Sequence, residues 1–506
     1  MHASALSLPI ELLYFIFEHL QNQTQEEPND LLAEIVVSHV CSAWRSIAIG
    51  YPRFWSWYAY RHEKRHKQEL ERLVVYLERS CNHPLYLWFV LRSYLPGPRI
   101  LHPRAHSDTK ESRAISLIQK ATKHARRWRC ISIDIRGAEE SYQRSSSFFS
   151  PLQNLSFPEL ETFEVYVPRL LYSAYLDDLF GGELATPKLW FVRIDPISSL
   201  HFNPPHSITT LELHWEYGDP YPLMPEFLEV LLEIMASPML TTVSIIGEMF
   251  DDACTTGFLS KRKRFSTSIK NLRCSSSIFS SAIFRHFQFP RLEMLFLQEI
   301  VLRRIFNFRP IDPILKIFPR LRTLILLNCY SLTRECIISL AQYTQNVKHL
   351  YILQDPALLI GVHLVDYEER SVFFAIVDEK ILSNTTIWPD LDTVMFSTPL
   401  PHVISSEQVA SCIDIVQIRK KQCMLRIPRY NAKYWESEDP VLWASFSDTG
   451  KLEIIPVDAN KSIGRWLPWP SRKLQGIKRL ADIYNGDPFL RPIDSSLEDY
   501  DSSGNS

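Results

Sequence analysis

The stretch FPRLRTLIL at residues 318–326 decides the fold of this chain, because residues 289–297 repeat it almost unchanged as FPRLEMLFL. After the proline, both stretches place apolar residues at the spacing L-x-x-L-x-L. Alternate residues of a strand point to opposite faces, so the last two leucines of each stretch share one face. The pattern predicts a short strand with one face in a core and the other face open.

Copies of this pattern extend through most of the chain. They lie at residues 84–89, 128–133, 157–165, 186–194, 208–213, 240–245, 269–274, 347–352 and 388–396. Successive copies are mostly roughly 20 to 32 residues apart, which is near the period of leucine-rich repeats. A unit of this size cannot close its own core, so neighbouring units stack. We therefore expect an α/β fold: a leucine-rich-repeat solenoid over residues 61–430, with a curved parallel sheet and outer helices. A conventional α/β domain with parallel strands and proline-led loops is the alternative.

The most complete unit spans residues 321–350 and resembles the cysteine-containing leucine-rich repeat that often follows an F-box. The resemblance implies that Cys329 and Cys336 are small buried apolar residues. The nine cysteines of the chain are scattered and never form a C-x-x-C pair. This distribution favours free thiols in a reducing compartment.

The N-terminal stretch LPIELLYFIFEHL at residues 8–20 predicts a helix with Pro9 in its first turn. Leu13, Ile16, Phe17 and Leu20 form one apolar stripe, but Ile10, Leu12, Tyr14 and Phe15 fall on other faces. A helix that is apolar nearly all round lies deep in a core or is covered by another chain. The polar residues that follow, Gln21 to Asp30, favour the second explanation.

A second helical pattern runs from Leu31 to Ile49, with Asp30 expected as its N-cap and Gly50-Tyr51-Pro52 after its end. An aromatic cluster, residues 54–58, follows it. Three short helices in sixty residues bury too little surface to be stable alone. We therefore expect them to pack on a partner or on the neighbouring repeats.

These residues resemble the F-box, and most closely the version found in large fungal F-box families. The Leu-Pro opening, the Val-Cys-x-x-Trp-Arg centre at residues 40–45 and the Pro-x-x-Trp end at residues 52–55 occur in order. The polar insert at residues 21–30 departs from the family and is expected to lengthen a loop. The resemblance implies a small all-α F-box over residues 1–60 that contacts its adaptor through Leu8, Pro9, Leu12, Ile16, Val40, Trp44 and Trp55. The alternative is a helical cap that binds nothing.

By the same resemblance, the chain is expected to be the substrate-recognition subunit of a Skp–cullin–F-box ubiquitin ligase. A Skp-type adaptor, and a cullin through it, would be partners, and the repeats would hold an unknown protein target. A scaffold role outside a ligase is the alternative. We expect no enzyme activity, no cofactor and no metal site. The segment His62-Glu-Lys-Arg-His66 matches the H-E-x-x-H zinc pattern, but its lysine and arginine would be costly to bury beside a metal ion.

Charge and composition exclude other classes. The net charge of −2 gives no general attraction to nucleic acid or membranes, and no apolar run is long enough to span a bilayer. The basic runs at residues 261–264 and 419–421 fit solvated loops better than a nuclear localisation signal or a phosphate-binding patch. We expect a cytoplasmic or nuclear protein. Residues 431–506 are expected to be a C-terminal extension with a disordered acidic end.

Overall fold

The structure is a computed structural model. It describes residues 8–26, 33–60, 66–90, 107–134, 150–166, 186–194, 207–214, 225–247, 265–275, 280, 283–284, 287–298, 300, 302, 318–329, 334–353, 376–377, 381–397, 406–419, 423–447 and 449–455.

The N-terminal module is helical, as predicted. It consists of α1 (Ile10–Glu26), α2 (Ala33–Val40), α3 (Ser42–Ile49) and the 3-10 helix η2 (Pro52–Trp55). Helix α1 continues through Gln21 to Glu26, so the first part of the polar insert is helix and the prediction of a loop there is wrong. Cys41 separates α2 from α3. Its extended backbone ends α2, and its Sγ accepts a hydrogen bond from Trp44 N at 3.4 Å, which caps α3.

A single open sheet of fourteen strands follows, in which every pairing is parallel. Its strands are β1 (Trp57–Ala59), β2 (Leu85–Val90), β3 (Trp128–Asp134), β4 (Thr162–Tyr166), β5 (Phe191–Ile194), β6 (Thr210–His214), β7 (Thr242–Ile246), β9 (Asn271–Cys274), β11 (Met294–Gln298), β12 (Thr323–Leu327), β13 (His349–Leu353), β14 (Thr393–Ser397), β15 (Met424–Pro428) and β16 (Leu452–Ile455). β8 (Phe265–Ser266) and β10 (Phe287–Gln288) form a separate parallel pair.

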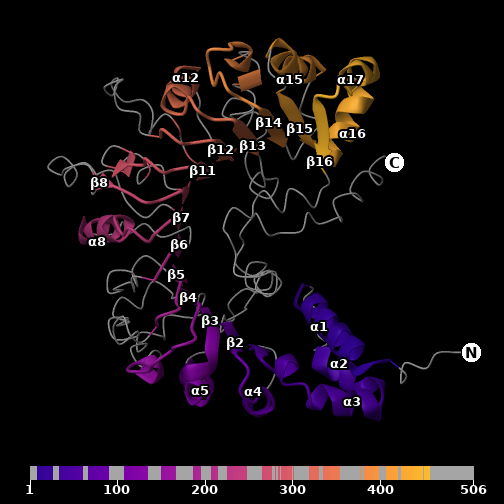
Figure 1. Cartoon of the computed structure of the whole chain (residues 1–506), viewed down its shortest axis with the longest axis vertical. Helices are drawn as coiled ribbons and strands as arrows, with labels where there is room; N and C mark the ends of the chain where they lie inside the picture. The colour runs from indigo at the N-terminus through magenta and orange to yellow at the C-terminus, as the bar shows by residue number, and fades with distance from the viewer. Residues whose placement is uncertain are drawn as a thin grey trace, which may run out of the picture.

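The sheet lines the inside of an arc, and the helices lie on its outside (Figure 1). These helices are α4 (His66–Arg79), α5 (Ser107–Thr122), α8 (Pro225–Met235), α12 (Arg334–Tyr343), α15 (Ser406–Ile418), α16 (Arg429–Glu438) and α17 (Pro440–Ser447). Short 3-10 helices lie at η3 (Ala125–Arg127), η5 (Ser150–Leu152) and η7 (Ile381–Ser383). The N-terminal module occupies one end of the arc and α17 the other.

The repeat pattern fixes the register of the sheet. All eleven copies contain a strand, and neighbouring strands align the same pattern position: Leu295 pairs with Leu324, and Leu324 with Leu350. These positions face the outer helices and are fully buried. Cys329 and Cys336 are buried in the same core, as predicted. The fold is therefore the predicted α/β leucine-rich-repeat solenoid, preceded by a small all-α module.

The sheet extends past both domain boundaries expected from the sequence. β1 starts at Trp57, before residue 61, and β16 ends at Ile455, after residue 430. One continuous core joins Leu13 and Phe17 of the N-terminal helices to Trp443 and Phe446 at the far end. The N-terminal module and the described part of the C-terminal extension are thus structural parts of the solenoid.

Some predicted features lie outside the described residues: Asp30, His62 with the following three residues, the basic run at 261–264, and the acidic end of the chain. Within the described residues, no helix is long and apolar enough to cross a membrane.

Candidate functional site

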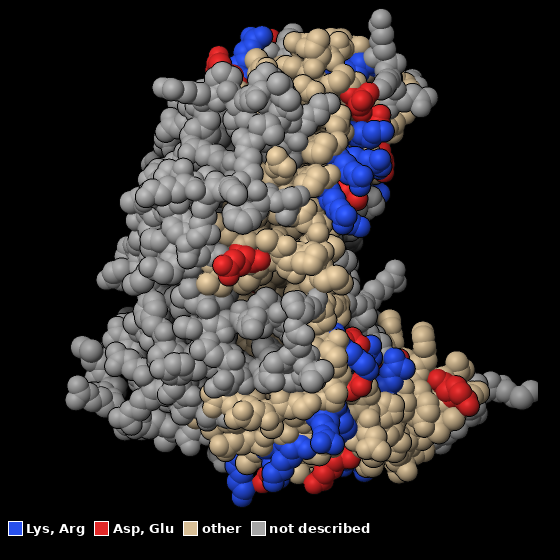
Figure 2. All heavy atoms as spheres, turned by 60° about the vertical axis from the view of Figure 1, so that its left-hand side comes forward, with Lys and Arg blue, Asp and Glu red and all other residues tan. Residues whose placement is uncertain are grey.

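The N-terminal module exposes more large apolar side chains than any other described part of the chain. Eleven such side chains are exposed among the described residues, and seven of them lie between residues 8 and 49. These seven are Leu8, Ile10, Leu12, Phe15, Ile35, Val40 and Ile49, with Phe15 exposed by 70%, Val40 by 52% and Leu12 by 50%. The lobe that holds these helices is largely uncharged in Figure 2. We call these seven residues the N-terminal apolar surface.

Helix α1 has one buried face and one exposed face. Leu13 and Phe17, four residues apart, are buried against the rest of the module. Leu12 and Phe15, three residues apart, lie on the opposite face with Leu8 in line before them. α1 is thus apolar on both faces, and the face with Leu12 and Phe15 stays exposed.

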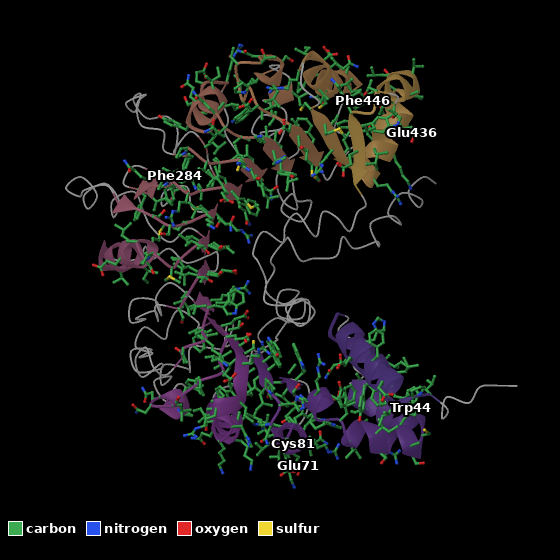
Figure 3. All side chains as sticks on the ribbon, viewed as in Figure 1. Trp44, Glu71, Cys81, Phe284, Glu436 and Phe446 are labelled. Atoms are coloured by element: carbon green, nitrogen blue, oxygen red, sulfur yellow. The ribbon has the colours of Figure 1, made fainter. Side chains whose placement is uncertain are left out.

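Aromatic rings hold α1 in place from its buried face. The Phe17 ring lies 5.4 Å from the Trp44 ring, edge to face, and 5.6 Å from the Phe54 ring. Trp44 is half-buried and packs on the core from α3, and it lies at the opposite end of the arc from Phe446 (Figure 3). Trp44 therefore packs against the buried face of α1 through Phe17, and part of its own side chain is exposed at the surface.

Of the seven residues predicted to contact an adaptor, four lie on the surface: Leu8, Pro9, Leu12 and Val40. Ile16 and Trp44 are half-buried. Ile10, Phe15, Ile35 and Ile49 were not predicted as contacts, although they belong to the same exposed set. The signal for Ile10 and Phe15 was present in the sequence, because both are apolar residues off the main stripe of the first helix.

Trp55 does not lie on this surface but is buried beneath the module, so a supporting role fits it, and its contact with an adaptor stays a prediction. Its side chain is only 6% exposed, and its Nε1 donates a hydrogen bond to the Ala48 carbonyl at 2.7 Å. The Arg79 guanidinium lies over its ring at 4.4 Å, and the Tyr76 ring packs on it edge to face. Trp55 thus joins α3 to the first outer helix, α4.

A polar cluster fastens η2 to α1. Tyr51 Oη donates a short hydrogen bond to Glu18, and Arg53 forms an ion pair with the same carboxylate at 3.1 Å. The Tyr51 ring also stacks on Tyr14, with ring centres 4.0 Å apart. Burial, followed by the Glu18 hydrogen bond, raises the pKa of Tyr51 to about 12. Tyr51 therefore stays a neutral donor at physiological pH.

A second polar cluster fixes the N-terminal module to the first repeat. Tyr76 on α4 donates a short hydrogen bond to Glu34 on α2, across 42 residues of sequence. Arg72 forms an ion pair with Glu69 at 2.7 Å and lies over the Tyr58 ring at 4.4 Å. Burial raises the pKa values of Tyr58 and Tyr76 well above the usual range. The module is thus held in one orientation relative to the sheet.

The strand face opposite the outer helices carries polar and aromatic groups. Arg193 on β5 and Glu212 on β6 form a buried ion pair at 2.7 Å. At the start of the sheet, the Trp57 ring stacks on Tyr86 at 3.9 Å and on Trp88 at 5.5 Å. These side chains come from alternate strand positions, as the repeat pattern predicts, but Arg193, Glu212, Trp57 and Trp88 are all buried, so this part of the face is not open as expected.

No described group of three or more His, Cys, Asp or Glu side chains could hold a metal ion.

Comparisons with known proteins find a weak structural likeness. No protein-family model matches the chain. No curated protein matches it either. Among solved structures, the yeast complex of Rad7 and Elc1 is similar over 66% of this chain and 87% of the other, with 12% identical residues and a TM-score of 0.29. A likeness this weak carries no argument about fold or function.

Proposed function

We propose that the N-terminal module is an F-box that binds a Skp-type adaptor, and that the solenoid holds a protein target. The chain would then be the substrate-recognition subunit of a Skp–cullin–F-box ubiquitin ligase. Two independent lines support this proposal: the F-box-like order of Leu8-Pro9, Val40-Cys41 with Trp44, and Pro52 with Trp55, and the exposure of the N-terminal apolar surface.

The apolar surface is the observation that carries the proposal. Full burial of one large apolar side chain is worth about 1.5–3 kcal/mol, so covering several half-exposed ones contributes substantially to binding. Contiguous apolar patches on soluble proteins mark interaction sites. Leu12, Phe15 and Val40 are the most exposed of the seven residues, since each is at least half exposed.

The orientation of the module suits a receptor. The Glu34–Tyr76 hydrogen bond and the Arg72 cluster hold α2 against α4, so an adaptor on α1 would stand at a fixed distance from the repeats. A fixed distance would favour the transfer of ubiquitin to a bound target by the other subunits of the ligase. The chain itself needs no catalytic residue for this role.

A scaffold role outside a ligase is the alternative function. It shares the adaptor-binding surface and differs only in the absence of a cullin. Co-purification of the adaptor without a cullin would favour the scaffold, and co-purification of both would favour the ligase receptor.

Replacement of Leu12 by glutamate tests the adaptor proposal. The full chain should capture a purified Skp-type adaptor, and Leu12→Glu should weaken capture by about tenfold or more, because a charge would enter an apolar interface. Val441→Glu is the matched control, since Val441 is 81% exposed on α17 at the opposite end of the arc. Binding that is absent in the wild type, or equally weakened by both variants, would refute the proposal.

A further inference from the structure

The residues around the start of each strand form a charged edge along the N-terminal ends of the parallel strands. The residue just before each strand is in register with its neighbours: Glu293 N donates to Lys270 O at 2.8 Å, Arg322 N to Glu293 O at 2.9 Å, and Lys348 N to Arg322 O at 2.8 Å. Two residues earlier, the same edge carries Arg291 and Arg320. Repetition of the pattern therefore places side chains from successive repeats side by side.

Basic residues predominate on this edge from β9 to β13. At the positions one and three residues before these strands lie five exposed cations: Lys270, Arg291, Arg320, Arg322 and Lys348. Glu293 is the one carboxylate at the same positions. Five positive charges and one negative charge leave +4, in a chain whose net charge is −2. Figure 2 shows basic side chains gathered along one margin of the upper half of the molecule. We call these five residues the basic edge.

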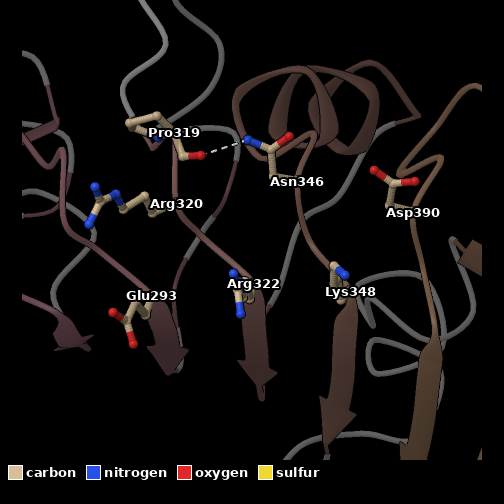
Figure 4. Close-up of a pocket in the computed structure, with 7 residues that line it drawn as sticks. All are labelled: Glu293, Pro319, Arg320, Arg322, Asn346, Lys348 and Asp390. Carbon is tan, nitrogen blue, oxygen red and sulfur yellow. Dashed lines mark hydrogen bonds between the residues drawn. The ribbon is translucent and has the colours of Figure 1, made fainter.

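The middle of the basic edge is hollowed. The hollow has a volume of about 440 Å³ and is lined by Glu293, Pro319, Arg320, Arg322, Asn346, Lys348 and Asp390. Asn346 Nδ2 donates to the Pro319 carbonyl at 2.7 Å and closes its upper rim (Figure 4). Arg322 and Lys348 stand beside each other at the starts of β12 and β13, with Arg320 above them (Figure 4).

The positive charge of the basic edge ends at acidic residues on one side and at uncharged residues on the other. On the β14 side it meets Asp390 and Asp392, and Lys348 lies 3.9 Å from the Asp392 carboxylate. On the other side the corresponding residues are the uncharged Thr209 and Thr241. The pKa of nearby His349 is lowered, first by burial and further by Arg426, Lys348 and Arg322, against the opposing effect of Asp392. Among the charges, Asp392 therefore acts most strongly on His349, which fits its place at the β14 end of the basic edge.

We propose that the basic edge binds an acidic peptide segment, rich in Asp and Glu, of a partner protein. Neighbouring strands are about 4.8 Å apart, so the three steps from Lys270 to Lys348 span roughly 14 Å. An extended peptide advances about 3.3 Å per residue, so about four or five residues cover this distance. Arginine fork geometry suits carboxylates.

An acidic peptide fits this edge better than a single-stranded nucleic acid does. The residues that line the hollow include no aromatic side chain. Single-strand binding sites combine positive charge with aromatic platforms on which bases stack. The lining holds three cations, Arg320, Arg322 and Lys348, against the two carboxylates of Glu293 and Asp390. The excess of cations, with the Asn346 amide, matches carboxylates and a peptide backbone.

This inference names a chemical class for the target in the proposed function, but its test does not involve the adaptor. A failure at the basic edge would leave adaptor binding untouched, and the reverse also holds.

The test is the binding of a labelled synthetic peptide of about eight residues, in which Glu alternates with Ser, to the full chain. We expect binding that weakens as salt is raised, and no binding of the same peptide with Gln in place of Glu. The double variant Arg320→Glu/Arg322→Glu should bind about tenfold or more weakly. Arg334→Glu is the matched control, because Arg334 is exposed on α12 in the same repeat but lies away from the basic edge.

Three results would overturn the proposal. The first is equal binding of the Glu and Gln peptides. The second is wild-type affinity in the double variant, with its circular dichroism spectrum showing a folded chain. The third is tighter binding of a single-stranded oligonucleotide of equal charge, which would reassign the basic edge to nucleic acid.

Discussion

Arg419 stabilises the C-terminal repeats through its guanidinium group. It is 4% exposed and donates to the carbonyls of Leu382, Ile387 and Trp388 at distances from 2.7 to 3.2 Å. Burial lowers its pKa from the usual arginine value. The residue therefore belongs to the core and does not form part of a basic surface signal with Lys420 and Lys421.

Replacement of Arg419 by alanine should destabilise the region around β14 by roughly 3 kcal/mol or more, because three buried carbonyls would lose a charged donor. Amide hydrogen exchange of β14 measures this loss. Arg334→Ala, at an exposed position, should change the same exchange rates little. Equal exchange in Arg419→Ala and the wild type would show that the carbonyls are satisfied in another way.

Burial of single residues was the least predictable feature of the candidate site. Leu12 and Trp55 both match F-box positions, yet Leu12 is half exposed and Trp55 is buried. The difference comes from α4, whose Tyr76 and Arg79 cover Trp55 from outside the F-box-like stretch. Spacing along the first sixty residues contains no information about that contact.

At the scale of single elements, the strand β1 makes the N-terminal module depend on the repeats. Trp57 to Ala59 pair with Tyr86 to Trp88 of β2, and Tyr58 is buried against α4. A strand without a neighbour leaves its backbone hydrogen bonds unpaired and is not stable. The small helices before it have too little core of their own.

The fragment of residues 1–60 should therefore fail to fold cooperatively. Its circular dichroism should show weak helicity and no sharp thermal transition. The fragment of residues 1–134, which adds α4, β2, α5 and β3, should show a more cooperative transition. A sharp transition in the shorter fragment would show that the module is an independent domain, with its boundary at residue 60.

Strands were easier to predict than helix ends. Each copy of L-x-x-L-x-L became a strand because the alternation of apolar residues directly encodes a strand with one buried face. β1, β15 and β16 were missed because they carry only part of the pattern. The break at Cys41 was missed as well, since a thiol is a weaker helix cap than Ser or Asp and gives little sequence signal.

At the scale of the whole molecule, stacking rather than domain closure determines the architecture. The core runs without a break from the N-terminal helices to α17, and every strand of the main sheet pairs with its neighbours in parallel. The period of the pattern predicted this class of fold, because units that cannot bury their own apolar face must stack. It could not predict that the terminal helices join the same core, because they lie outside the repeat pattern.

The arc also separates two surfaces of different chemistry. The N-terminal apolar surface lies on α1, α2 and the end of α3, whereas the basic edge lies on repeats toward the other end of the sheet. An apolar partner site and an acidic-peptide site joined by one continuous core would let a single chain hold two partners. This is the arrangement that a substrate receptor requires.

Hydrogen exchange of the full chain with and without a purified Skp-type adaptor tests the central claim most directly. The account predicts that the adaptor slows exchange in residues 8–19 and 35–40, and leaves the amides of β11 to β14 unchanged. An adaptor that leaves residues 8–19 unprotected, or that protects the strands instead, would contradict the assignment of the N-terminal apolar surface as the adaptor site.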